Sequence, residues 1–258
     1  MHVVHDSALL AGTAVVLVTV VAPARAAGVG PSHQPGWPVP AEDITYGQVL
    51  FDRLEYQAGD EEDIWLWDAQ AFWGGDEQRV WLETEGEDVD ESGAGGELER
   101  LDLFYGRLVD RFWELRGGVG YQSTYGPGPD VERASLVVGL QGMAPYWFEV
   151  DARLRVDEDG NAALEAETEY DWRLTQDWIL QGRAETALAF DAVEDFGIGE
   201  GVTGLTLGLR LRYHLRPEIA PYVGLTWSDR FGDTADLAEA EGEDTETSAV
   251  VAGVRWWF

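Results

Sequence analysis

Apolar and polar residues alternate with a period of two through most of this chain, and that pattern limits its fold more than any other feature. Residues 146–156 read YWFEVDARLRV, in which apolar side chains alternate with charged ones from Phe148 onward. Residues 204–214 repeat the pattern, with leucines alternating against Thr, Gly and Arg. A period of two is typical of β-strands whose two faces meet different surroundings. The sequence therefore predicts an all-β fold.

Twelve segments of this kind follow one another along the chain. Most are long enough for a tilted strand that crosses a bilayer, which needs about 9–11 residues. The alternation is least regular in the first and third segments, so ten strands is the alternative count. The predicted strands are 46–57, 63–73, 79–86, 97–107, 110–122, 132–143, 146–156, 162–173, 178–190, 202–214, 218–229 and 247–258.

The connections between these segments alternate in length. Tight connections follow the even-numbered segments, as at 144–145 and 175–177, whereas most connections after odd-numbered segments are longer and acidic, as at 86–96 and 231–246. A soluble β-sandwich also alternates along its strands, but it does not sort loop length in this way. Short turns at one end and long loops at the other predict a transmembrane antiparallel up-and-down β-barrel over residues 46–258, with both termini in the periplasm.

The N-terminus carries an export pattern. Residues 8–22 are an unbroken apolar run, too short for a transmembrane helix of about 20 residues, and Ala-Arg-Ala follows at 24–26. This pattern predicts a signal peptide over residues 1–26. An N-terminal membrane anchor is the alternative, because residues 1–7 contain no Lys or Arg. Residues 27–45 are rich in Pro and Gly and predict a flexible periplasmic lead-in to a barrel in the bacterial outer membrane.

The last segment ends in three aromatic residues with no polar tail behind them. Val250, Ala252, Val254, Trp256 and Phe258 share one face of the predicted strand. In an outer-membrane barrel that face meets lipid, while the strand itself closes against the first. We expect Trp256 and Phe258 to form the assembly signal that the barrel assembly machinery recognises. The alternative is an ordinary final strand of a soluble sheet.

The other face of the strands is densely charged. Charges on the lipid face of a barrel cost about 2–4 kcal/mol each at the midplane, so these side chains should face the lumen. Both signs are present, and pairs between strands should leave a narrow barrel occluded rather than open. The predicted lumen charge ladder consists of Arg116, Glu149, Arg153, Glu165, Glu167, Arg183, Arg210 and Arg212.

Acidic residues dominate the composition. Asp and Glu outnumber Lys and Arg by 49 to 17, which gives a net charge of -32. Such a chain is unsuited to nucleic acid, because phosphate binding needs a basic surface. The acidic loops have two interpretations, which are a vestibule that attracts cations and a merely solvated acidic surface.

Several stretches, taken together and in order, resemble the outer-membrane copper resistance protein B family (CopB). They cover nearly all of residues 46–258. The resemblance implies a copper-tolerance role at the outer membrane, through binding or passage of copper ions, and a copper-binding protein in the periplasm as a candidate partner. The stretches are YGQVLFDRLEY (46–56), FWGGDEQRVWLETEGE (72–87), RFWELRGGVGYQ (111–122), GLQGMAPYWFEVDA (139–152), ETEYDWRLTQ (167–176), RYHLRPEIAPYVGLTW (212–227) and VAGVRWWF (251–258).

One departure from the family bears on copper. Members commonly carry a Met- and His-rich segment ahead of the barrel, whereas residues 27–45 hold only His33 and no Met. The chain contains no Cys, so Met143 and His214 are the candidate copper ligands, because thioether sulfur suits Cu(I) and imidazole suits both oxidation states. They belong to predicted strands four apart, which favours two separate weak sites over one tight site.

Two other functions compete with copper handling. The scarcity of Met and His favours an occluded or nonspecific channel barrel that has lost specific metal binding. An outer-membrane lipase would need Ser and His together on the outer surface, yet His214 is the only His after residue 33, its alternation turns it inward, and no GxSxG motif occurs. We therefore do not expect an enzyme.

Overall fold

The computed structural model describes residues 45–59, 63–90, 95–126 and 131–258. The predicted signal peptide, and the predicted lead-in apart from residue 45, lie outside these ranges, so both remain predictions.

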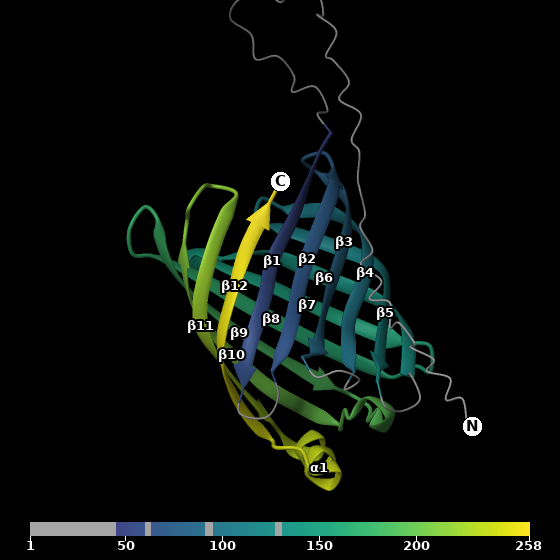
Figure 1. The fold of residues 1–258 in the computed structure, drawn as a ribbon. Coiled ribbons are helices and arrows are strands. Elements are labelled where there is room, and N and C mark those ends of the chain that lie inside the picture. The colour runs from purple at the N-terminus through teal and green to yellow at the C-terminus, as the bar shows by residue number, and fades with distance from the viewer. Residues whose placement is uncertain (1–44, 60–62, 91–94, 127–130) are drawn as a thin grey trace, which may run out of the picture. The chain divides into compact units, whose positions relative to one another are not determined.

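The described chain forms a closed barrel in which every neighbouring pair of strands is antiparallel (Figure 1). The first strand pairs with the last, so the sheet has no free edge. The predicted count of twelve strands is confirmed. The elements in chain order are β1 (Tyr46–Gly59), β2 (Ile64–Gly74), β3 (Gln78–Val89), β4 (Gly96–Asp110), β5 (Trp113–Tyr125), β6 (Val131–Ala144), η1 (Pro145–Trp147), β7 (Phe148–Asp157), β8 (Ala162–Arg173), β9 (Trp178–Ala189), η2 (Glu194–Phe196), β10 (Gly201–Tyr213), β11 (Ile219–Arg230), α1 (Gly232–Glu241) and β12 (Glu246–Trp257).

The two ends of the barrel differ. We call the end with the short connections after even-numbered strands the turn end; β1 begins there and β12 finishes there. The opposite end, which we call the loop end, carries η2 and α1. In outer-membrane barrels the short turns face the periplasm and the longer loops face the exterior.

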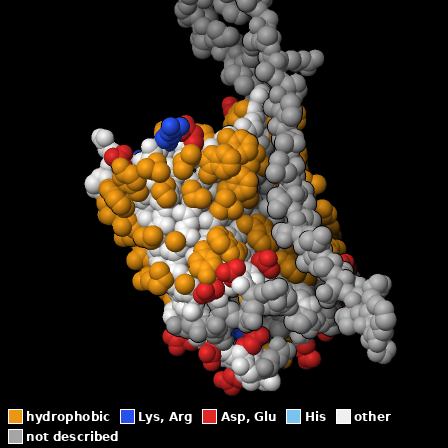
Figure 2. All heavy atoms as spheres, viewed as in Figure 1, with side chains coloured by type: hydrophobic (Ala, Val, Ile, Leu, Met, Phe, Trp, Pro, Cys, Tyr) orange, Lys and Arg blue, Asp and Glu red, His pale blue; other side chains and the backbone are white. Residues whose placement is uncertain are grey.

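Side-chain burial is inverted relative to a soluble protein. Outward residues such as Leu136 and Val250 are 68% and 61% exposed, whereas Glu55 and Asp102 inside the barrel are 0% exposed. Figure 2 shows apolar side chains over the barrel wall and acidic side chains gathered at the end where α1 lies. An apolar wall around a charged interior is what a strand barrel in lipid requires.

A bulge in β1 explains why the alternation is irregular there. The registers of β1 with β2 and with β12 both shift just after Phe51. A β-bulge places an extra residue in one strand, and here the consecutive residues Asp52 and Arg53 are both buried. The bulge therefore adds a charged side chain to the lumen that strict alternation would have sent outward.

The connection between β11 and β12, which we expected to be a long loop, contains the helix α1. Its sequence, GDTADLAEAE, is rich in Ala, Leu and Glu, which favour helix. Gly242 ends the helix with φ of 88°, and its N–H donates to the carbonyls of Ala238 and Glu239. The Gly199 N–H donates to Thr234 Oγ1 over 3.0 Å, which joins α1 to the loop before β10. Within the described part of the chain, no helix combines the length and hydrophobicity needed to span a bilayer.

Candidate ion-binding lumen

The inner strand faces bring charged residues from the whole circumference together. Between β7 and β8, Arg153 lies opposite Glu165 and Asp151 lies opposite Glu167. The ion pairs do not simply follow this register, because Arg153 pairs with Asp151 on its own strand and reaches Glu83 on β3 at 3.0 Å. Charges in this lumen therefore pair across the barrel as well as along its wall.

The structure places the residues of the predicted lumen ladder on the inner wall with different partners. Arg116, whose side chain is fully buried, pairs with Glu83 and Asp151. The other ladder contacts are Arg155–Glu165 at 3.0 Å, Arg183–Glu167 at 2.9 Å, Arg210–Glu55 at 2.7 Å and Arg212–Asp171. Glu149 differs from these residues because it is exposed and lines a cavity at the turn end.

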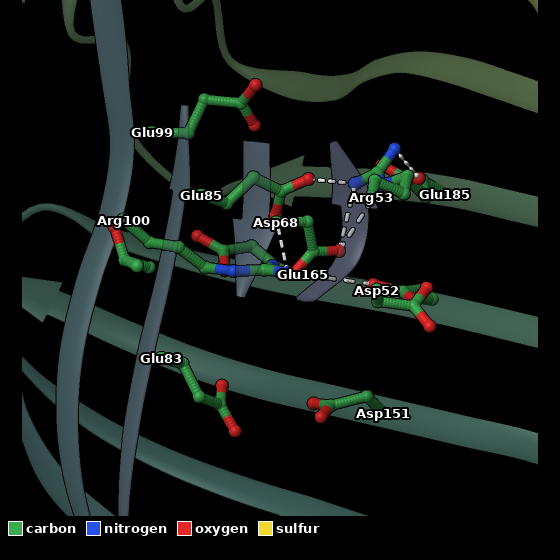
Figure 3. A network of polar contacts seen from close by, with 12 residues as sticks. Asp52, Arg53, Asp68, Glu83, Glu85, Glu99, Arg100, Asp151, Glu165 and Glu185 are labelled. Carbon is green, nitrogen blue, oxygen red and sulfur yellow. Dashed lines mark hydrogen bonds and ion pairs between the residues drawn. The ribbon is translucent and has the colours of Figure 1, made fainter. Parts of the chain in front are cut away.

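A connected set of ion pairs crosses the middle of the lumen, and we call it the lumen bridge. Arg183 on β9 reaches Asp68 on β2 at 3.4 Å, although these strands are five apart around the barrel. Arg53 pairs with Asp68 at 3.2 Å, with Glu85, and with Glu185 at 3.5 Å (Figure 3). The lumen bridge consists of Arg53, Asp68, Glu85, Arg100, Glu167, Arg183 and Glu185.

Small residues on the wall leave room for these long side chains. A Cβ atom on Gly120 of β5 would collide with Arg155 Nη1 and Asp102 Oδ1. Those two side chains are hydrogen-bonded at 3.1 Å and 3.0 Å, from β7 to β4. Glycine at this position therefore belongs to the charge network, because any larger residue would displace a buried ion pair.

Two cavities lie on either side of the lumen bridge. The cavity toward the loop end has a volume of about 820 Å³, and the cavity toward the turn end has a volume of about 400 Å³. Carboxylates far outnumber arginines around the larger one. Its acidic lining residues are Glu85, Glu87, Glu97, Glu99, Asp151, Glu165, Glu167, Glu185, Glu194, Asp195, Asp229 and Glu243, and its arginines are Arg100, Arg153 and Arg230.

Three carboxylates of the loop-end cavity form what we call the acidic mouth. Glu87 on β3 lies directly opposite Glu97 on β4, and Glu99 follows two residues later on the same face. Among the described residues, none of the three forms an ion pair with an arginine. Like charges directly opposite each other destabilise a sheet, so this end of the lumen would gain from a cation.

The two candidate copper ligands lie in different cavities. Met143, near the end of β6, lines the turn-end cavity, where it lies opposite Glu149 in the register. His214, just after β10, lines a separate cavity of about 190 Å³ together with Glu218 and Arg255. Among the described residues there is no cluster of three or more His, Cys, Asp or Glu side chains arranged to hold a metal ion.

His214 is available as a ligand in its neutral form. Its Nε2 atom is buried and has no hydrogen-bond partner within the described residues. Burial lowers the pKa of His214 below its usual range, and the neighbouring Arg212 and Arg255 lower that pKa further. A metal binds neutral imidazole, so the lowered pKa keeps this side chain competent for a metal at neutral pH.

Several network residues were missing from the prediction. Arg53 lies at the β1 bulge, where the alternation breaks down. Its buried partner Glu85 lies in β3, the other strand with an irregular pattern. Glu55 is the partner of Arg210, from which it is separated by 155 residues. Charge on the inner face was the available signal, but a single sequence does not say which distant strands meet across the lumen.

Comparison with known proteins gives a consistent result. A family model described as copper resistance protein B precursor (CopB) matches residues 45–258. Copper resistance protein B of Escherichia coli is 39% identical over 210 residues, which cover 81% of this chain and 69% of that protein. The copper resistance protein B homolog of Pseudomonas syringae pv. tomato (strain ATCC BAA-871 / DC3000) is 34% identical over 207 residues, covering 80% and 68%.

The fold is similar to that of solved outer-membrane porins. A NanC porin structure superposes with a TM-score of 0.50 at 15% sequence identity, covering 82% of this chain and 99% of the porin. At that identity the likeness concerns the fold alone, and it agrees with the closed antiparallel barrel of this chain.

Proposed function

The chain belongs to the copper resistance protein B family, and from that premise we propose that this outer-membrane barrel binds copper ions in its lumen and holds or passes them at the outer membrane. The proposal includes no catalytic step. Copper is the cargo of the protein, and the lumen side chains are its ligands.

The observation that carries this proposal is the acidic loop-end cavity. Carboxylates line it in large excess over arginines, and the acidic mouth has no arginine partner among the described residues. A cleft lined by one sign of charge between low-dielectric walls raises the local concentration of ions of the opposite sign. We propose that the acidic mouth collects cations, copper among them, at the outer face of the barrel.

Selectivity for copper needs other ligands. Carboxylates alone bind Ca²⁺ or Mg²⁺ about as readily as copper. Met143 and His214 supply thioether sulfur and neutral imidazole at the turn end, each in its own cavity. We propose two weak sites there, which a periplasmic copper-binding protein could unload.

A triple variant tests the acidic mouth. We expect Glu87→Gln/Glu97→Gln/Glu99→Gln to weaken copper binding by the purified, detergent-solubilised barrel several-fold at low ionic strength, because three carboxyl ligands without arginine partners among the described residues are replaced by amides. The control is Asp76→Asn/Glu77→Gln/Asp177→Asn, which makes the same number of acid-to-amide replacements on exposed turn-end residues. Equal copper affinity in the two variants would remove the acidic mouth from the proposal.

A double variant tests the selective ligands. We expect Met143→Leu/His214→Gln to retain the acidic mouth but lose the preference for copper over zinc in competition titrations. Because the pKa of His214 is lowered, copper binding at the His214 cavity should persist as the pH falls to the usual histidine pKa and weaken only below it. If the double variant keeps full copper preference, the selective ligands lie elsewhere.

A second candidate function is an occluded barrel without specific metal binding. The lumen bridge supports it, because ion pairs fill the middle of the lumen between the two cavities. The two candidates differ in one measurable respect, since only a copper-handling barrel should prefer copper to zinc.

A further inference from the structure

Four side chains separate the two lumen cavities. Arg100, Asp151, Arg153 and Glu167 line both the loop-end cavity and the turn-end cavity. The remaining residues of the lumen bridge each line at most one of the two cavities. Asp68 and Arg183 line the turn-end cavity, whereas Glu85 and Glu185 line the loop-end cavity. The partition between the cavities is therefore only one layer of charged side chains thick.

Arg100 and Arg153 are the members of this layer that reach across the lumen. From β4, Arg100 approaches Glu167 of β8 at 3.9 Å and Asp68 of β2 at 4.0 Å, and it also pairs with Glu85 of β3. The strands β4 and β8 are four apart around the barrel. Arg153 of β7 also crosses to Glu83 of β3 at 3.0 Å, but Glu83 lines only the turn-end cavity. Within the layer, Arg153 pairs with Asp151 on its own strand.

We infer that the contact between Arg100 and Glu167 closes the lumen to hydrated ions, and that removing both side chains joins the two cavities into one continuous pathway. A mobile ion that entered from either side would have to displace a partner from a buried pair, and buried pairs are screened far less than exposed ones. This closure concerns all small ions, so it stands independently of whether copper is bound.

The charges that remain also set the selectivity of the opened barrel. The acidic mouth and the other carboxylates of the loop-end cavity are unaffected by removal of Arg100 and Glu167. An ion pathway that starts between carboxylates admits cations in preference to anions. We therefore expect the opened barrel to pass K⁺ more readily than Cl⁻.

The variant Arg100→Ala/Glu167→Ala tests the inference and leaves no new unpaired charge in the bridge. Glu85 keeps Arg53, and Arg183 keeps Asp68 and Glu185. The full-length protein is reconstituted into planar bilayers in KCl. We expect the wild type to stay near the baseline conductance and the double variant to conduct several-fold more, with a reversal potential that shows cation preference.

Arg230→Ala is the matched control, because Arg230 also lines the loop-end cavity but its ion pair among the described residues is with the exposed Glu243. It should conduct like the wild type. A wild type that conducts as an open pore, or a folded double variant no more conductive than the wild type, overturns the inference. If the alanine variant does not assemble, Arg100→Ser/Glu167→Ser, which also shortens both side chains but keeps a polar group at each position, takes its place and must still raise the conductance.

Discussion

Deletion of Phe258, or its replacement by Asp, is expected to prevent assembly into the outer membrane while synthesis and export continue. Phe258 closes the barrel, since its N–H donates to the Val49 carbonyl at 3.0 Å and its carbonyl accepts from the Val49 N–H at 2.9 Å. Its ring is 61% exposed and contacts Trp256, which in turn stacks on Phe51 of β1. Phe258 thus contributes both to the backbone seam between β1 and β12 and to its apolar outer face.

The assembly test is membrane fractionation followed by electrophoresis with and without heating, because a folded barrel migrates differently from the unfolded chain. Phe112→Asp is the matched control, since Phe112 is also an exposed aromatic residue at the turn end but lies in the β4–β5 connection. We expect Phe112→Asp to assemble and Phe258→Asp to fail. Wild-type amounts of heat-modifiable Phe258→Asp barrel in the outer membrane would contradict the assembly role.

The second large effect concerns the ion pair between Arg210 and Glu55. The two groups are 2.7 Å and 2.9 Å apart in a bidentate contact, with 3% and 0% of their side chains exposed. Arg210→Ala leaves a buried, unpaired carboxylate, and breaking a buried pair in this way costs about 3–5 kcal/mol. We expect a loss of that size in the free energy of unfolding, measured by urea titration of the barrel in detergent micelles.

Two further variants separate the ion pair from a general packing effect. Arg210→Ala/Glu55→Ala leaves no uncompensated charge and should recover part of the lost stability. Arg230→Ala breaks an exposed pair with Glu243 and should change the free energy of unfolding by at most about 1 kcal/mol. If Arg210→Ala is no more destabilising than Arg230→Ala, the lumen pairs are solvated and do not hold the barrel together.

The strands and their order were predictable from the sequence because a period of two is a local property. Each inner face is charged and each outer face is apolar, so one residue of register slip would expose charge to lipid along a whole strand. The alternation of short and long connections likewise predicted which connections share an end of the barrel. The bulge at Asp52 and Arg53 obscured the pattern of β1 because it adds one residue locally.

The lumen partners were not predictable from one sequence. Arg183 meets Asp68 across 115 residues and Arg210 meets Glu55 across 155 residues, and both contacts depend on barrel closure. Cross-strand neighbours follow from hairpins, whereas contacts across the lumen depend on barrel diameter and side-chain reach. The helix α1 was missed for a different reason, because its acidic residues were interpreted as a solvated loop although Ala, Leu and Glu also favour helix.

We assign copper handling and lumen closure to different parts of the same lumen. The acidic mouth collects cations at the loop end, the lumen bridge separates that cavity from the turn end, and Met143 and His214 lie on the turn side. In this picture copper binding and bulk ion conductance are separate properties of one lumen. Loss of closure should leave copper binding at the acidic mouth intact.

Equilibrium binding of copper and of zinc to the wild-type protein, purified and reconstituted in liposomes, tests the copper proposal most directly. Metal held by the proteoliposomes and metal passed into their interior are measured together, with protein-free liposomes as the blank. We expect the protein to retain copper in clear preference to zinc at equal concentrations. Equal retention of the two metals, with no preferential passage of copper, would contradict the proposal that this lumen handles copper.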